Sequence, residues 1–110
     1  MLTDDLIFLS RVAGTARALG LSVKQARSPA AVLELAGREA PAALILDLHH
    51  NGLDLPALLA ALPVRPRVIA YGSHVEAETL RAARKAGCDL VLPRSEFVAR
   101  LESDLPAWLA

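Results

Sequence analysis

The chain has 110 residues, a length typical of one domain with one hydrophobic core. Its 12 basic and 12 acidic residues balance, so no positive field is available to attract nucleic acid or an anionic membrane. The single cysteine, Cys88, excludes an internal disulfide, no apolar run is long enough to span a membrane, and residues 1–5 lack the features of a signal peptide. We therefore expect one cytoplasmic domain over residues 1–110 that binds neither nucleic acid nor membrane.

Short apolar runs alternate along the chain with stretches in which apolar residues recur at helical spacing. The run from Leu6 to Leu9 is typical of a strand buried on both faces, and Gly20 ends the helix expected after it. Ser28 followed by Pro29 is a helix start, with a capping residue and a proline in the first turn. The pattern predicts strands at residues 6–9, 21–26, 43–46, 68–71 and 90–92, and helices at residues 10–20, 29–39, 55–62, 75–86 and 97–108.

The second half of the chain has the clearer helix signals. The helix over residues 75–86 has an apolar and a charged side, and Gly87 ends it. The last helix carries one apolar stripe, and Pro106 is expected to kink or divide it. The residues of that stripe are Phe97, Leu101, Leu105 and Trp108.

Five apolar strands that alternate with five helices predict a three-layer α/β fold with a five-stranded parallel sheet and right-handed crossovers. In such sheets the functional crevice lies at the carboxyl ends of the strands. The residues expected there are Ser10, Arg11, Asp47, Gly72, Ser73, His74, Pro93, Arg94 and Ser95.

Two segments carry a resemblance to a known family. Leu44 to Asp47 is followed by Gly52 and Asp54, and Ala86-Gly87-Cys88-Asp89 leads into the last strand. These segments resemble the receiver domain of bacterial response regulators, and the resemblance covers essentially the whole chain. It implies a single receiver-like domain of flavodoxin-like (βα)5 fold with strand order 2-1-3-4-5. It also implies that Asp47 is the equivalent of the aspartate that this family phosphorylates.

The acidic pair that holds Mg²⁺ in this family is expected to be lost. The family places two acidic residues directly after the first strand, where the predicted strand places Ser10 and Arg11. A guanidinium is always charged and offers no oxygen ligand, so we expect no bound metal. Asp4 and Asp5 precede the predicted strand and are therefore expected at the opposite edge of the sheet. Our hypothesis is that Arg11 takes the place of the ion and locks Asp47.

Two further positions depart from the family pattern. Gly72 stands where the family has the serine or threonine that switches conformation, and the nearest hydroxyl is that of Ser73. Arg94 stands at the place of the family lysine and lacks its compact geometry. Both departures disfavour phosphorylation-dependent switching.

The function expected from the resemblance is that of a stand-alone pseudo-receiver in two-component or phosphorelay signalling. It is expected to act through protein contacts, without phosphorylation, cofactor or enzymatic activity. The expected partner is a histidine kinase, a transcription regulator or a second copy of the chain. The face for a homodimer is that of the fourth helix, fifth strand and fifth helix, with Phe97 and Trp108.

Several alternatives stay open. The first is a receiver that a histidine kinase phosphorylates at Asp47 with Mg²⁺. The second is a small-ligand or metal-binding α/β domain that uses His49 and His50, with His74 nearby. Residues 47–52 also fit the D-x-H-x-x-G motif of cobalamin-binding domains, but no Gly-Gly completes it. A hydrolytic triad of Ser73, His74 and Asp47 lacks the G-x-S-x-G elbow.

Overall fold

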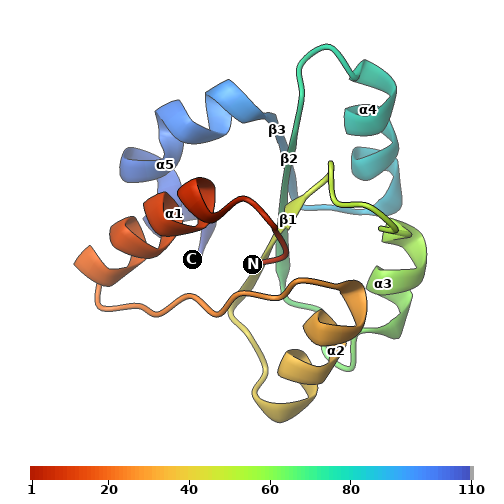
Figure 1. The fold of residues 1–110 in the computed structure, drawn as a ribbon, viewed down its shortest axis with the longest axis horizontal. Coiled ribbons are helices and arrows are strands. Elements are labelled where there is room, and N and C mark those ends of the chain that lie inside the picture. The colour runs from red at the N-terminus through yellow and green to blue at the C-terminus, as the bar shows by residue number, and fades with distance from the viewer. Residues whose placement is uncertain (110) are drawn as a thin grey trace.

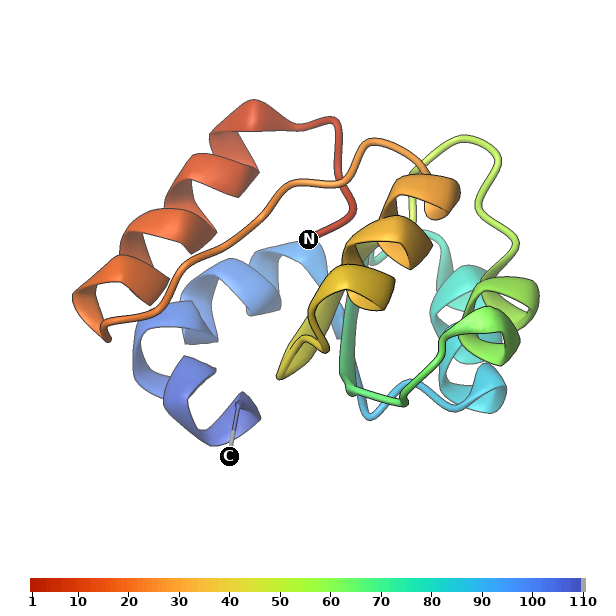
Figure 2. The ribbon, with the colours of Figure 1, turned by 90° about the horizontal axis from the view of Figure 1, so that it is seen from below.

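The structure, a computed structural model, describes residues 1–109 and has three layers (Figure 1). The middle layer is a parallel sheet of β1 (Ala43–Asp47), β2 (Arg67–Gly72) and β3 (Leu90–Pro93), in that order. Two helices, α1 and α5, cover one face of the sheet, and α2, α3 and α4 cover the other (Figures 1 and 2). The bounds of the helices are α1 (Leu6–Ala18), α2 (Pro29–Arg38), α3 (Leu55–Ala61), α4 (Ala77–Ala86) and α5 (Arg94–Trp108).

A short N-terminal segment extends the sheet beyond β1. Leu2 forms isolated parallel bridges with Leu46 on one side and with Ala26 on the other. The Leu2 N–H donates to the Ile45 carbonyl at 2.8 Å, and the Asp47 N–H donates to the Leu2 carbonyl at 3.0 Å. The order of backbone segments is thus Ala26, Leu2, β1, β2, β3. This order follows the expected 2-1-3-4-5 arrangement, but only three of the five expected strands form.

The strand predicted at residues 6–9 is wrong, because these residues form the first turns of α1. The Asp5 side chain caps the helix by accepting a hydrogen bond from the Phe8 N–H at 3.0 Å. Phe8 is buried against the sheet, whereas Leu6 and Ile7 are 57% and 79% exposed. The apolar run therefore contains exposed as well as buried positions of the helix. A run of only four apolar residues shows no periodicity that distinguishes a helix from a strand.

The strand predicted at residues 21–26 is reduced to the single bridge at Ala26. Ala26 is hydrogen-bonded to the segment from Met1 to Thr3. The Ala26 N–H donates to the Met1 carbonyl at 2.8 Å, and the Thr3 N–H donates to the Ala26 carbonyl at 3.3 Å. Residues 21–25 form no strand, and the Leu21 N–H donates to the Ala16 carbonyl of α1 at 2.9 Å.

The other predicted elements are confirmed with shifted boundaries. Ser28 caps α2 through a bond from the Ala31 N–H at 3.1 Å, and Gly87 ends α4 with φ of 105°, a conformation that favours glycine. The fourth helix begins at Ala77, and Val75 lies outside it and is 75% exposed. The last helix begins at Arg94 and continues through Pro106 as one helix, so it is not divided there.

The sheet has one apolar core on each face. The core under α2, α3 and α4 is made of aliphatic side chains, with Leu46, Val68 and Ala70 fully buried. The core under α1 and α5 contains an aromatic stack, in which Phe97 packs on Tyr71 at 4.8 Å and on Trp108 at 5.4 Å between ring centroids. All four apolar residues predicted for the last helix lie in this second core.

Two further observations concern the environment of the chain. Within residues 1–109, no helix combines the length and the apolar content that crossing a bilayer requires. Burial raises the pKa of the Cys88 thiol to about 11, so the thiol stays protonated at neutral pH. Cys88 packs against the aliphatic core, as expected for a small structural residue.

We expect Phe97→Ala to lower the free energy of unfolding by about 3–5 kcal/mol, because it removes the centre of the aromatic stack and leaves a cavity. Phe97 is 0% exposed. Val75→Ala, at an exposed position, is the control and should change the free energy by less than about 0.5 kcal/mol. Urea unfolding followed by circular dichroism measures both variants. Equal effects of the two substitutions would contradict this description of the core.

Candidate functional site

Several polar residues meet at the carboxyl edge of the sheet. The N-terminal segment ends at Thr3, β1 ends at Asp47, and β3 is followed directly by Arg94. Because parallel segments place their carboxyl ends at one edge, Asp4 and Asp5 also lie there. The expectation that these two aspartates lie at the opposite edge is wrong, since it rested on the strand predicted at residues 6–9.

The Thr3 hydroxyl joins three parts of this edge. Its Oγ1 donates to Asp47 Oδ2 at 3.2 Å, and it accepts from the Asp5 N–H at 3.0 Å and from the Tyr71 hydroxyl at 3.4 Å. One donor and two acceptor positions are all that a hydroxyl offers, so Thr3 is fully used. Thr3 is 0% exposed, and burial raises the pKa of Tyr71, which keeps the phenol protonated as a donor.

Asp47 is a buried carboxylate whose two oxygens both accept hydrogen bonds. Only 7% of the residue is exposed. Its Oδ1 accepts from the His49 N–H at 2.9 Å, and its Oδ2 accepts from Thr3. The backbone of Asp47 is held as well, because its N–H donates to Leu2 and its carbonyl accepts from the His50 N–H. The carboxylate is thus fixed at the end of β1 by neighbours on both sides.

Asp5 forms an ion pair with Arg94. Its Oδ2 accepts from the Arg94 guanidinium, while its Oδ1 caps α1. The same guanidinium lies 4.4 Å from the centroid of the Phe8 ring, an arrangement typical of a cation–π contact. The hydrogen bond from the Phe8 N–H, together with the Arg94 contact, holds the pKa of Asp5 below its ordinary value. Arg94 thereby ties the first turn of α5 to the first turn of α1.

The structure places Ser10 and Arg11 in the middle of α1, at exposed positions. They do not follow a strand, because the segment that occupies the first strand position ends at Thr3. The hypothesis that Arg11 takes the place of an ion beside Asp47 is therefore wrong in its geometry. Arg94 is the cation that lies at this edge, and its partner is Asp5 instead of Asp47.

Gly72 and Ser73 follow β2 at the same edge. A Cβ added at Gly72 would lie 3.3 Å from Leu80 Cδ2 and 3.4 Å from Leu48 Cβ, so this position is closely packed. The Ser73 hydroxyl accepts from the Val75 N–H at 3.3 Å, within its own loop. Ser95, the residue after Arg94, is exposed.

The three histidines do not converge. His49 Nε2 accepts from the Ser73 N–H at 3.1 Å, which joins the loops after β1 and β2. The His50 side chain contacts a different part of the chain. Its Nε2 lies 2.7 Å from the Arg27 carbonyl oxygen and 3.3 Å from Asp4 Oδ2. His74 is exposed. Within residues 1–109, no group of three or more metal-ligating side chains is close enough to hold an ion.

Sequence reasoning missed Thr3, Asp4 and Asp5 as residues of this edge. The available signal was the Asp-Asp pair just before an apolar run, since an aspartate in that position is a frequent N-cap of a helix. Interpreting Asp5 as a cap would have moved the start of the helix to Leu6. The first extended segment would then have ended at Thr3.

We expect Asp5→Asn to preserve the cap of α1 and to lose the ion pair with Arg94, whereas Asp5→Ala loses both. The alanine variant should be less stable than the asparagine variant by about 1 kcal/mol at neutral pH, the usual value of a cap. Because the pKa of Asp5 is lowered in the folded chain, its charge stabilises the fold above about pH 4, and this contribution is lost as pH falls through the lowered pKa.

Urea unfolding of the wild type and of Asp5→Asn between about pH 7 and pH 3 measures this contribution. The difference between the two proteins should shrink as the solution is acidified. A difference that stays constant down to the lowest pH would contradict the role of the Asp5 charge.

No protein-family model matches the sequence, and no curated protein matches it either. Solved structures do match. The receiver domain of NtrX from Brucella abortus is 24% identical with a TM-score of 0.78, over 98% of this chain and 94% of that one. A putative response regulator from Chloroflexus aurantiacus is 20% identical with a TM-score of 0.80, over 98% of this chain and 93% of that one.

A third similar structure is a response regulator protein from Burkholderia pseudomallei with a phosphorylated aspartic acid, calcium ion and citrate. It is 23% identical with a TM-score of 0.71, over 96% of this chain and 66% of that one. The chain spans only 25% of the longer NtrX chain from Brucella abortus. With its parallel sheet between two layers of helices, the chain has the fold of response regulator receiver domains.

Proposed function

We propose that the chain is a receiver-like signalling module that acts through protein contacts and does not depend on phosphorylation of Asp47. The observation that carries the proposal is the ion pair between Arg94 and Asp5 at the carboxyl edge of the sheet. In this proposal the chain is not an enzyme, and it works in the cytoplasm, where a protein with a single unpaired cysteine is common.

The residues at this edge, as they are arranged, do not fit a divalent ion. Mg²⁺ needs a near-octahedral set of oxygens and is held in proteins by carboxylates. Each oxygen of Asp5 accepts a hydrogen bond, one from the Phe8 N–H and the other from Arg94. Both oxygens of Asp47 also accept hydrogen bonds. The Asp4 carboxylate lies beside the His50 ring, with Oδ2 3.3 Å from Nε2. The Arg94 guanidinium that pairs with Asp5 opposes a second cation at this carboxylate.

Gly72 supports the same proposal. The resemblance to receivers places a hydroxyl-bearing switch residue at this position, and glycine supplies no side chain to contact a phosphoryl group. Leu48 and Leu80 pack against it, so the space beside its Cα is already filled. Ser73 carries the nearest hydroxyl, and its Oγ accepts a hydrogen bond within its own loop.

A second candidate is a receiver phosphorylated at Asp47, as the Burkholderia pseudomallei protein is on an aspartic acid. The position of Asp4 and Asp5 at the same edge as Asp47 favours it, since two carboxylates are then available next to the acceptor. In this candidate function, Asp5 must release the Arg94 guanidinium and bind a divalent ion in its place. The two candidates therefore differ in whether Arg94 can be displaced.

We expect no phosphoryl group on Asp47 after incubation with acetyl phosphate and Mg²⁺, because Asp5 is paired with Arg94 and is therefore not available to hold the ion. Intact-mass spectrometry measures incorporation. Amide NMR shifts on addition of Mg²⁺ and beryllofluoride, a phosphate mimic, provide an independent readout. The regulator from Burkholderia pseudomallei serves as the positive control.

Asp47→Asn is the matched control for this experiment. Incorporation by the wild type that is absent from Asp47→Asn would overturn the proposal and establish the second candidate. Shifts centred on Asp47 and α4 with beryllofluoride would do the same. Equal, small incorporation in both proteins would indicate modification elsewhere and agree with the proposal.

The partner in this proposal is a protein, with a histidine kinase, a transcription regulator and a second copy of the chain as the candidates. The proposed contact face is that of α4, β3 and α5. On α4 this face carries exposed charges that include the Glu78–Arg81 ion pair. Phe97 and Trp108 are 0% and 6% exposed, so they belong to the core and do not contribute to the face.

If the partner is a second copy, we expect amide NMR shifts of α4 and α5 to change with protein concentration, because the proposed contact buries these helices. Shifts of α2, on the opposite side of the molecule from α5, serve as the internal control (Figure 1). A dilution series of the wild type measures both. Spectra that do not change with concentration would contradict the homodimer.

A further inference from the structure

A groove of about 420 Å³ lies between α3 and α4, which pack side by side over the aliphatic core (Figures 1 and 2). Two polar side chains line it, and both are used within the chain. Asp54 Oδ1 accepts from the Ala57 N–H at 3.2 Å and thereby caps α3, and Thr79 Oγ1 donates to Glu76 Oε2 at 3.4 Å. The groove is otherwise apolar, and its other lining residues are Leu48, Leu53, Leu55, Pro56, Ala82 and Ala83.

The exposed side of α3, next to this groove, carries no charge. Residues 55–64 include no charged residue. Leu55 and Leu58 are buried in the core, and the exposed residues of the helix are Pro56, Ala57, Ala60 and Ala61. A surface helix normally carries charged or polar residues on its outer side. An uncharged helix face that adjoins an apolar groove is typical of a surface that a partner covers.

The charges beside the groove are separated by sign along its length. Each of the two helices leads from one parallel strand to the next, so α3 and α4 run in the same direction and begin at the same edge of the sheet. Asp54 and Glu78 lie where these helices begin. Arg81 and Lys85 lie further along α4. Arg81 pairs with Glu78 at 2.5 Å, whereas Lys85 forms no ion pair within residues 1–109. One end of the groove is therefore acidic and the other is basic.

We propose that this groove binds an amphipathic helix of a partner protein, which lies antiparallel to α3 and α4. Helices commonly carry acidic residues in the first turn and basic residues in the last turn, because these charges favour the helix dipole. In the antiparallel orientation, the basic end of such a helix lies beside Asp54 and Glu78, and its acidic end lies beside Lys85. Opposite charges select this orientation, and burial of the apolar stripe supplies most of the affinity.

The lining defines the pattern of the bound helix. A helix in a groove presents apolar residues that recur at spacings of three and four. Ala82 and Ala83 are small, so the backbone of the bound helix can approach α4 closely. Leu48 and Leu53 offer apolar surface to larger side chains, such as leucine, on the bound helix. The partner helix should therefore carry a leucine-rich stripe between its two charged ends.

The positions of the charges define the length of the bound helix. Glu78 and Lys85 are separated along α4 by about 10 Å at a rise of roughly 1.5 Å per residue. About two turns of the partner helix therefore lie between its acidic and basic ends. The groove contains no residue of β3 or α5, and the inference is independent of the proposed function.

The experiment is a titration of the ¹⁵N-labelled full chain with the blocked helical peptide acetyl-Glu-Glu-Ala-Leu-Ala-Gln-Leu-Leu-Ala-Gln-Leu-Ala-Ala-Lys-Lys-amide. We expect saturable NMR shifts of the Leu53, Ala57, Thr79 and Ala82 amides. The amides of α5 should not shift. Absence of saturable shifts up to millimolar peptide, or shifts confined to other surfaces, would overturn the proposal.

Two variants with the same substitution test whether the groove itself is the site. Ala82→Glu places an unpaired charge in the lining and should weaken peptide binding by about tenfold or more. Ala99→Glu, on α5, should bind the peptide as the wild type does. Both alanines are exposed on helices, so both variants should fold, which circular dichroism checks. Equal peptide binding by the two variants would contradict binding between α3 and α4.

A second peptide, with glutamine in place of its two Glu and two Lys residues, tests the charge arrangement. It keeps the leucine stripe and should bind the wild type about tenfold more weakly than the charged peptide. The difference between the two peptides should shrink for the chain that carries Glu78→Gln and Lys85→Gln. A difference of the same size for both chains would arise from the helicity of the peptides and would contradict the antiparallel charge pairing.

Discussion

Met1, Leu2 and Thr3 insert between Ala26 and β1, and this insertion determines where the chain leaves the sheet to begin α1. Leu2 is 0% exposed and exchanges two backbone hydrogen bonds with β1, while its neighbours bond to Ala26 and Lys24. Because this segment ends at Thr3, the next two residues emerge at the carboxyl edge of the sheet. Asp5 is then in place to cap α1, which crosses the face that α5 also covers (Figure 2).

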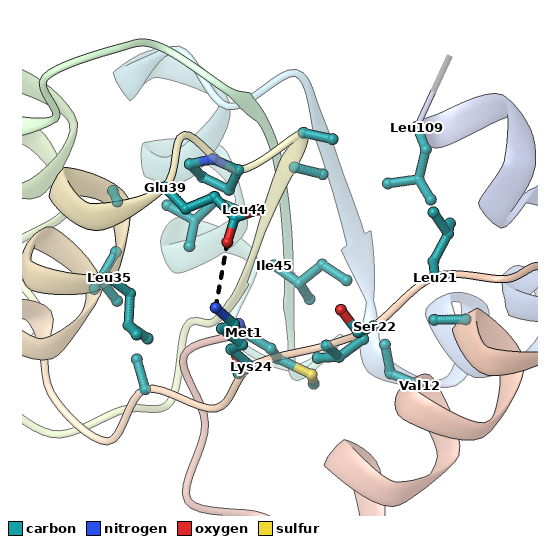
Figure 3. Close-up of a pocket in the computed structure, with 18 of the residues that line it drawn as sticks. Met1, Val12, Leu21, Ser22, Lys24, Leu35, Glu39, Leu44, Ile45 and Leu109 are labelled. Atoms are coloured by element: carbon teal, nitrogen blue, oxygen red, sulfur yellow. Dashed lines mark hydrogen bonds and ion pairs between the residues drawn. The ribbon is translucent and has the colours of Figure 1, made fainter.

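The same short segment contributes residues to both edges of the sheet. At the carboxyl edge, the Thr3 hydroxyl connects Asp47, Asp5 and Tyr71, and the Asp5 carboxylate is shared between a helix cap and Arg94. Of the two carboxylates that Thr3 links, only Asp5 pairs with a cation, Arg94. At the amino-terminal edge, Met1 lines a pocket together with residues of β1 and of the extended stretch 21–24 (Figure 3).

Much of the fold was predictable because its signals are local. The three strands of the sheet are continuous apolar runs, and the caps at Ser28 and Gly87 follow from the chemistry of single residues. The first strand was not predictable from periodicity, because only Leu2 within it is a buried apolar residue of the core. Leu6 to Leu9 offered a longer apolar run, and its assignment as a strand moved the expected acidic pair to Ser10 and Arg11. The contact between Asp5 and Arg94 joins residues 89 positions apart, which no local pattern predicts.

In the proposed function, Arg94 holds Asp5 and thereby keeps a divalent ion away from Asp47. The most direct measurement is paramagnetic broadening of the backbone amides by equimolar Mn²⁺, which reports where a divalent ion resides. We expect the amides of Asp5 and Asp47 to be broadened no more than those of exposed acidic residues elsewhere, such as Glu34 and Glu102. Selective broadening centred on Asp5 and Asp47 in the wild type would contradict it.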